Sequence, residues 1–343
     1  MWKRLSVSLV PVLFAAAAAA QEPADPRMED WPNGTQRLRQ ERATDASGAV
    51  VPHGRSVRWH SSGMIAENGR YELGERTGEW QFRFENGSVR ARGEYRDGKA
   101  QGPWTFWFEN GAKSKEGVYE AGVAQGVWKR FASGAEALVE QGTYVDGRVE
   151  GLYEWWYHSG EKEAECEFRA GVPHGRWTKW AKDGTELERG GYREGAQHGA
   201  WSLWNEEGQL VSQVGWDQGL RHGPAATWAE DGTQLSKGSW EHGVEAGDWE
   251  WWHTDGTKVL EGSFENGAES GRWSSWALDG TLTDRGTFVE GSADGEWSSW
   301  YADGTLRAKG SYADGLAEGT WSYYRPDGEL EREVRYRAGR EAR

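Results

Sequence analysis

From residue 54 onward, aromatic, glycine and polar positions recur along the chain with a period of 24 residues. A glycine opens each repeat, and every step between opening glycines is 24 residues except one step of 25. The opening glycines are Gly54, Gly78, Gly102, Gly126, Gly151, Gly175, Gly199, Gly223, Gly247, Gly271, Gly295 and Gly319. Counting the opening glycine as position 0, we number the following positions +1 to +23. A fixed period of this length indicates a repeat architecture in which each unit packs on its neighbours.

Each repeat contains two β-forming runs, and in eight of the twelve repeats Asp-Gly or Asn-Gly separates them near +8 and +9, as in GEWSSWYADGTLRAKGSYADG (295–315). This dipeptide predicts a hairpin with a two-residue turn in which both residues have positive φ. A second turn is predicted around +19 to +23, because +20 is Gly in all twelve repeats. Each repeat is therefore predicted to be one β-hairpin. A lone hairpin is marginal in water, so the hairpins must stack.

Tryptophan follows the same period, since 18 of the 24 tryptophans occupy +2 or +5. A two-residue turn at +8 and +9 makes positions that sum to 17 face each other, which sets +2 opposite +15, a glycine in nine repeats. A large ring beside a glycine covers the exposed backbone. Cys166 stands at +15 in one repeat, and we interpret it as a small residue in a glycine's place. The sequence thus predicts an all-β fold: an elongated, single, twisted antiparallel sheet of about twelve stacked hairpins over residues 54–343.

The N-terminal segment has a different composition. Lys3 and Arg4 precede an apolar run that ends in small residues before Gln21, which predicts a cleaved signal peptide over residues 1–20. The run is short for a transmembrane helix. Residues 21–53 show little periodicity, and we interpret them as a flexible N-terminal arm. The domain prediction is therefore residues 1–20 as signal peptide, 21–53 as arm and 54–343 as repeats.

Charge narrows the range of partners. Without residues 1–20 the chain has 38 Lys and Arg against 55 Asp and Glu, a net charge of −17. Such a surface repels phosphate backbones and anionic lipid headgroups, which argues against nucleic acid and makes a membrane partner unfavourable. A partner is expected to be neutral or basic. The single cysteine forms no internal disulfide.

The repeat text resembles the bacterial variant of the MORN (membrane occupation and recognition nexus) repeat, most clearly in GEWSSWYADGTLRAKGSYADG (295–315) and GRWTKWAKDGTELERGGYREG (175–195). The resemblance covers residues 54–343. It implies an antiparallel sheet of stacked hairpins that acts as an interaction surface or scaffold, with lipid binding proposed for the founding branch. Related bacterial proteins are labelled antitoxin-like, which implies inhibition of a cytoplasmic protein toxin.

Two columns of polar residues were candidates for metal sites. His174, His198 and His222 share position +23, but equivalent atoms in successive hairpins are about 9–10 Å apart, too far to bind one ion. The Asp residues at +8 suggest calcium, but hairpin turns already favour Asp there, and one carboxylate per hairpin does not supply six to eight oxygens. No catalytic motif stands out, so we predict no enzyme activity, no cofactor and no metal.

Tryptophan at +5 is the remaining candidate for a binding surface, because strict strand alternation places +5 on the face opposite +2. The candidate residues are Trp156, Trp180, Trp204, Trp228, Trp252, Trp276 and Trp300. Three functions follow. The preferred one is an exported, periplasmic or secreted scaffold for protein–protein interaction. The alternatives are a carbohydrate or peptidoglycan binding module that uses these rings, and an antitoxin-like inhibitor.

The signal-peptide prediction is testable on protein from the native host. We expect N-terminal sequencing to begin at Gln21, because cleavage follows the small residues Ala18 to Ala20. Protein that retains Met1 would contradict export and favour the antitoxin-like alternative.

Overall fold

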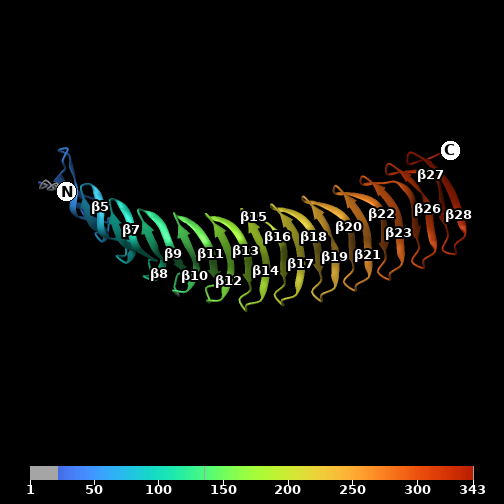
Figure 1. Ribbon diagram of the computed structural model, residues 1–343, viewed down its shortest axis with the longest axis horizontal. Coiled ribbons are helices and arrows are strands. Elements are labelled where there is room, and N and C mark those ends of the chain that lie inside the picture. The colour runs from blue at the N-terminus through green and yellow to red at the C-terminus, as the bar shows by residue number, and fades with distance from the viewer. Residues whose placement is uncertain (1–21, 135, 343) are drawn as a thin grey trace, which may run out of the picture. The chain divides into compact units, whose positions relative to one another are not determined.

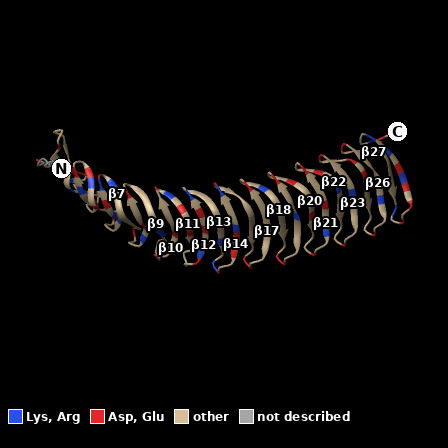
Figure 2. Ribbon diagram, in the orientation of Figure 1, with Lys and Arg blue, Asp and Glu red and all other residues tan. Residues whose placement is uncertain are grey.

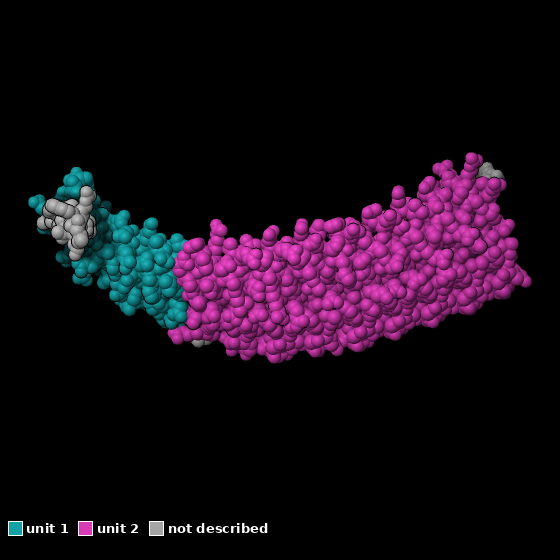
Figure 3. Space-filling model, in the orientation of Figure 1, with its two compact units in different colours: residues 1–123 teal, residues 124–343 magenta. Residues whose placement is uncertain are grey.

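The computed structural model describes residues 22–134 and 136–342, so the predicted signal peptide lies outside the described residues. Every helix or strand assigned within these ranges is a β-strand, and the strands pair antiparallel. The chain divides into two compact units, residues 1–123 and 124–343 (Figure 3). Within each unit, strands consecutive in sequence lie side by side (Figure 1). The predicted all-β fold of stacked antiparallel hairpins is confirmed.

The strands of the first unit are β1 (Pro23–Asp30), β2 (Gln36–Thr44), β3 (Val50–Trp59), β4 (Ile65–Glu72), β5 (Glu75–Arg83), β6 (Val89–Arg96), β7 (Lys99–Trp107) and β8 (Lys113–Glu120). The strands that follow are β9 (Val123–Phe131), β10 (Leu138–Val145), β11 (Arg148–Trp156), β12 (Lys162–Arg169), β13 (Val172–Trp180), β14 (Glu186–Arg193), β15 (Ala196–Gln197), β16 (Gly199–Trp204), β17 (Leu210–Asp217), β18 (Leu220–Trp228), β19 (Gln234–Glu241), β20 (Val244–Trp252), β21 (Lys258–Glu265), β22 (Ala268–Trp276), β23 (Leu282–Val289), β24 (Ser292–Ala293), β25 (Gly295–Trp300), β26 (Leu306–Ala313), β27 (Leu316–Tyr324), β28 (Leu330–Arg337) and β29 (Arg340–Glu341).

The turn at +8 and +9 differs from its prediction. Between β5 and β6, the Phe84 N–H donates to the Ser88 carbonyl and the Gly87 N–H donates to the Phe84 carbonyl, both at 2.9 Å. Gly87 has φ +84°, whereas Asn86 is not in the left-handed region. The loop therefore has three residues, a type I turn closed by a left-handed glycine. The prediction of two residues with positive φ is wrong here.

The predicted register is nevertheless correct, because a second irregularity compensates for the longer loop. Phe82 pairs with Ala91 and Arg83 with Val89, so β6 carries one extra residue, a β-bulge. The bulge restores the pairing of positions that sum to 17, and Trp80 lies opposite Gly93 as predicted.

The two-residue turn with positive φ occurs at the other end of the hairpin. Asp97 and Gly98, at +19 and +20, have φ of +50° and +72°, and the flanking Arg96 pairs with Lys99. This geometry matches the twist of the adjoining strands. The first turn residue is not glycine in any repeat, although φ is 45–52° at all twelve positions and this conformation costs a side chain about 1 kcal/mol. These residues are Leu73, Asp97, Ala121, Asp146, Ala170, Glu194, Gln218, His242, Asn266, Glu290, Asp314 and Ala338.

The tryptophan at +2 covers a glycine, but the glycine belongs to the preceding repeat. A Cβ placed on Gly93 would lie 2.2 Å from Cδ2 and Cε2 of Trp104, which lies in β7 and belongs to the next repeat. The ring of Trp80 lies on Gly69 in the same way. The prediction that ring and glycine share one hairpin is therefore wrong as to which ring provides the cover, and the contact joins two repeats instead.

The same indole also makes a hydrogen bond to the preceding repeat. A β-bulge between the repeats, which contains the opening glycine, interrupts the ladder next to position +15. The indole Nε1 then donates to the backbone carbonyl at +16, at 3.0–3.2 Å. The donors are Trp80, Trp104, Trp201, Trp249, Trp297 and Trp321.

Where the ring is missing, the residue beneath it has changed as well. Ala225 replaces the tryptophan at +2 and pairs with Val214, which replaces the glycine. At the first repeat, Ser56 accepts a hydrogen bond from Gln40 at 3.5 Å in the equivalent place.

Cys166 lies opposite Trp177 and is 2% exposed, and its burial raises the pKa of the thiol to about 11. The interpretation of Cys166 as a small filler fits this packing.

The predicted flexible arm differs from the structure. Residues 22–53 form β1, β2 and the beginning of β3, which pair as an additional hairpin on the first repeat. Its turn has the same hydrogen bonds as the other three-residue turns, from the Trp31 N–H to Thr35 and from the Gly34 N–H to Trp31. Asn33-Gly34 was the sequence signal for this turn, and the absence of the 24-residue spacing concealed it.

The coupling between glycine and ring predicts a specific mutational result. Gly93→Val should destabilise the first unit by about 2–3 kcal/mol, because the side chain collides with Trp104. Trp104→Ala should cost about 3–5 kcal/mol. The double variant reproduces the natural Val214 and Ala225 pair, so it should be more stable than the sum of the two by on the order of 1–3 kcal/mol in urea unfolding. Strict additivity would show that ring and glycine are not coupled.

Candidate functional site

The two faces of each sheet differ in chemistry. Trp80, Phe82 and Trp104 are all buried, and Trp80 stacks on Phe82 with ring centroids 6.0 Å apart. Tyr95 meets Trp104 edge-on at 5.2 Å. We call the face with +2, +4, +15 and +17 the ring face, and the opposite face, with +1, +3, +5, +14 and +16, the outer face. The ring face supplies the core, so the outer face is the candidate for binding.

The seven candidate tryptophans occupy the last residue of the first strand of their hairpins, where strand alternation directs +5 to the outer face. All seven are half-buried. They are Trp156, Trp180, Trp204, Trp228, Trp252, Trp276 and Trp300. Sequence reasoning therefore located them at equivalent positions, although whether they bind a ligand stays a prediction.

A cation lies over four of these rings. Lys162 is 5.8 Å from the ring centroid of Trp180, and Arg189 is 5.3 Å from that of Trp204. Lys237 lies 5.6 Å from the centroid of Trp252, and Lys258 lies 5.6 Å from that of Trp276. Each cation comes from the preceding repeat. Lys258 is held in place by Glu250 and Glu261, at 2.7 and 2.8 Å. At these four positions the ring contributes to cohesion between repeats through cation–π contacts.

The histidines at +23 have a structural role that the sequence did not reveal. His53, His174 and His222 accept a hydrogen bond at Nδ1 from the backbone N–H at +19 of the next repeat, at 3.4–3.5 Å. Gln101 and Glu150 accept the equivalent bond. The prediction that these histidines are solvated turn residues is therefore incomplete, because they cap the strained two-residue turn. The sequence signal for this capping role was the preference of position +23 for side chains that accept hydrogen bonds.

The aspartates at +8 are also engaged in turns. Hydrogen bonds from the backbone N–H of Thr185, and then from its hydroxyl, hold the pKa of Asp183 below its ordinary value. The pKa values of Asp231, Asp255, Asp279 and Asp303 are lowered by the same pair of bonds from the following threonine. Each carboxylate thus stabilises its own turn. Within residues 22–134 and 136–342, no group of three or more His, Cys, Asp or Glu could hold a metal ion.

One feature of the outer face was missed entirely. An open hollow of about 790 Å³ lies over β16 to β20, where the side chains at +1 and +16 are small. Ala200, Gly215 and Pro224 were the sequence signal for it, because most repeats carry longer side chains at these positions.

Among the described residues, no helix is long and apolar enough to span a membrane.

This arrangement of ring-sealed hairpins defines a class of β-hairpin repeat proteins. Comparison with known families matches residues 76–97, 293–314 and 317–338 to the MORN repeat variant. The chain therefore carries repeats of this type, and the resemblance seen in the sequence is confirmed. No curated protein matches the sequence.

Among solved structures, similar chains come from "Crystal Structure of TcdB2-TccC3-Cdc42" at 11% identity and "Crystal Structure of TcdB2-TccC3-TEV" at 12%. The matches cover 90% and 88% of this chain, and the chain spans 20% of the length of each match. The TM-score is 0.17 in both cases, which supports no inference about fold or function.

The turn aspartates predict a pH dependence. Their folded-state pKa values are lowered, so their stabilisation is present above the unfolded value of about 3.9 and is lost as pH falls through the folded value. Replacing all five by Asn keeps the turn, since Asn86 accepts the same bond from Ser88 at 2.8 Å. The fall in thermal midpoint between pH 7 and pH 3 should be smaller in this variant than in the wild type.

The control for this experiment removes five exposed acidic side chains from other positions, which gives the same change in net charge. Suitable Glu→Gln sites are Glu72, Glu120, Glu207, Glu241 and Glu290. An equal effect of both variants would mean that general charge repulsion, rather than the turn bonds, sets the acid sensitivity.

Proposed function

We propose that the protein is an exported, non-enzymatic scaffold whose outer face binds a neutral or basic protein partner. The observation that carries this proposal is the asymmetry of the faces. The aromatic side chains of the ring face pack between repeats, whereas the outer face, although buried at some +3 positions such as Thr178 and Ser274, presents polar and apolar side chains at regularly repeated positions. Regular spacing on a repeat sheet suits recognition of an extended surface.

The reactive side chains support a role without catalysis. Three of the histidines at +23 cap turns, His198 pairs with Asp217, and the aspartates at +8 close turns. Cys166 is buried with its pKa raised to about 11, so almost no nucleophilic thiolate is present at neutral pH. Groups already used in folding are poor candidates for proton transfer or nucleophilic attack.

Charge supports the class of partner. The full chain has a net charge of −15, and acidic side chains are distributed along strands and turns (Figure 2). Nucleic acids and anionic membranes are disfavoured by this charge, whereas a basic protein would be attracted by it. Export rests on the predicted signal peptide over residues 1–20.

Carbohydrate or peptidoglycan binding is the second candidate. It is favoured by Trp156, Trp228 and Trp300, because no described cation lies over these half-buried rings. Successive members of this set are three repeats apart, which is on the order of 29 Å at two strands per repeat. A glycan would therefore contact one such ring at a time, and affinity would depend on an extended polymer.

A reconstitution experiment tests the proposal. The mature chain, immobilised and cross-linked in the extracellular or periplasmic fraction of the native host, should retain a protein partner. The purified partner should then bind the purified mature chain with defined stoichiometry in calorimetry, and binding should weaken as salt increases. Binding of peptidoglycan fragments that is lost in Trp228→Ala, without any protein partner, would favour the second candidate. Substrate turnover by the mature chain would contradict the scaffold.

A further inference from the structure

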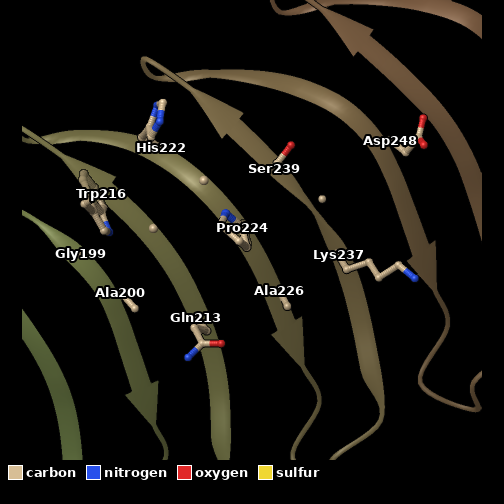
Figure 4. A pocket seen from close by; sticks show the side chains of 14 residues that line it. Gly199, Ala200, Gln213, Trp216, His222, Pro224, Ala226, Lys237, Ser239 and Asp248 are labelled. Atoms are coloured by element: carbon tan, nitrogen blue, oxygen red, sulfur yellow. The ribbon is translucent and has the colours of Figure 1, made fainter.

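The hollow on the outer face interrupts an otherwise regular array of side chains. Its floor follows β16 to β19, where Ala200, Pro224 and Ala226 present small side chains beside Gln213 (Figure 4). At the positions equivalent to Ala200 and Pro224, the repeat before them carries Arg176 and the repeat after them carries Asp248. The hollow therefore arises because long side chains are missing from two consecutive repeats.

The backbone itself forms part of the floor. A Cβ on Gly215 would lie 2.1 Å from the carbonyl oxygen of His222, so this position cannot carry a side chain without movement of the backbone. Ala200 and Pro224 are under no such restriction, because both are exposed. Packing within the sheet therefore explains the glycine but leaves the two small exposed residues unexplained.

Charged side chains border the apolar floor on one side. Lys237 and Asp248 line the edge of the hollow, and a second hollow of about 440 Å³ continues from them past Glu250 and Glu261. Lys237 is neutralised by its ion pair with Glu250. Asp248 is exposed, and its Oδ1 accepts one hydrogen bond, from the Ser263 hydroxyl at 2.5 Å. A carboxylate with remaining acceptor capacity thus stands beside an apolar depression.

The three repeats around the hollow are strongly acidic. Residues 199–270 contain thirteen Asp and Glu against three Lys and Arg, a net charge of −10, while the whole chain has −15. This concentration selects the sign of the occupant. A second copy of the same surface would be repelled, and a neutral glycan would gain nothing from the charge.

We propose that the hollow receives an apolar side chain carried on an extended, cationic segment of a protein partner, with Lys or Arg of that segment paired to Asp248 and the surrounding carboxylates. This inference rests on the proposed scaffold function and adds the location and chemistry of its anchor point. A central apolar anchor in a pocket, surrounded by a polar rim, is typical of a protein-binding hot spot.

The test uses three synthetic peptides with an N-terminal fluorophore. The probe is Gly-Lys-Lys-Leu-Lys-Lys-Gly, the second peptide has Ser in place of Leu, and the third has Glu in place of every Lys. Fluorescence anisotropy with the mature chain at low salt should show the probe binding at least tenfold tighter than the Ser peptide. The Glu peptide should show no binding, because the surface around the hollow is acidic.

Two pairs of variants localise the site. Ala200→Arg should fill the hollow and weaken probe binding at least tenfold, and it should fold because Arg55 and Arg176 occupy the same repeat position. Thr320→Arg makes the same type of change at an exposed +1 position in the last repeat, so its affinity should remain within twofold of the wild type. Asp248→Asn should weaken binding several-fold, whereas Glu296→Gln, at the matched position, should not.

Equal affinity of the Leu and Ser peptides, or equal effects of Ala200→Arg and Thr320→Arg, would overturn the anchor and leave only diffuse attraction of cations. The scaffold proposal is tested separately, by measuring how the native protein partner binds the wild type and the Ala200→Arg variant. If the partner binds the Ala200→Arg variant as tightly as the wild type, the scaffold stands and the hollow is not its anchor. If no protein partner binds either chain, the scaffold itself fails.

Discussion

The contact of an indole ring with the bare backbone of a glycine in the preceding repeat holds this protein together. Trp104 covers Gly93 so closely that no side chain fits between them, and its Nε1 donates to the Glu94 carbonyl at 3.2 Å. The ring thus buries apolar surface and adds a hydrogen bond to a backbone carbonyl beside the bulge. Because ring and glycine lie in different hairpins, neither hairpin is complete without its neighbour.

The turns show how this contact constrains the rest of the backbone. Both irregularities in a hairpin, the three-residue turn and the bulge that follows it, are needed to bring +2 and +15 into register. The tight turn at the other end places an ordinary residue, such as Leu73 or Ala121, in the left-handed region. That unfavourable conformation recurs in every repeat, and in eight repeats the side chain at +23 of the preceding repeat supports it by accepting the N–H of the strained residue. Polar columns that look like sites are therefore supports for the turns.

Much of the fold could be predicted from the sequence, because period, turn glycines and ring columns are all local signals. The pairing of Trp80 with Gly93 was correct, but only because the longer loop and the bulge cancel, and neither has a sequence signal as strong as the Asp-Gly pair. Which ring covers which glycine depends on side-chain direction across a bulge, which spacing alone does not give. The hairpin formed by residues 22–53 was missed because its spacing departs from the period.

The outer face was the least predictable part. The tryptophans at +5 were found by their period, yet the cations over Trp180 and Trp204 come from the preceding repeat and follow no strict column. The hollow at Ala200 and Pro224 is defined by what the repeats lack at two neighbouring positions. Sequence periodicity reveals residues that recur. The hollow is an interruption of the repeat, and it is recognised only when the positions of neighbouring hairpins in the sheet are known.

The exchange of Gly and Trp for Val214 and Ala225 has an evolutionary consequence. Since the two partners of each contact lie on opposite sides of a repeat boundary, gain or loss of one whole 24-residue module by recombination rejoins a ring to a glycine almost anywhere in the array. A crossover between Val214 and Ala225 would instead set a tryptophan against a valine or an alanine against an uncovered glycine. Insertion or deletion of a whole repeat at another boundary is therefore expected to preserve the contact, whereas a crossover inside this pair is expected to break it.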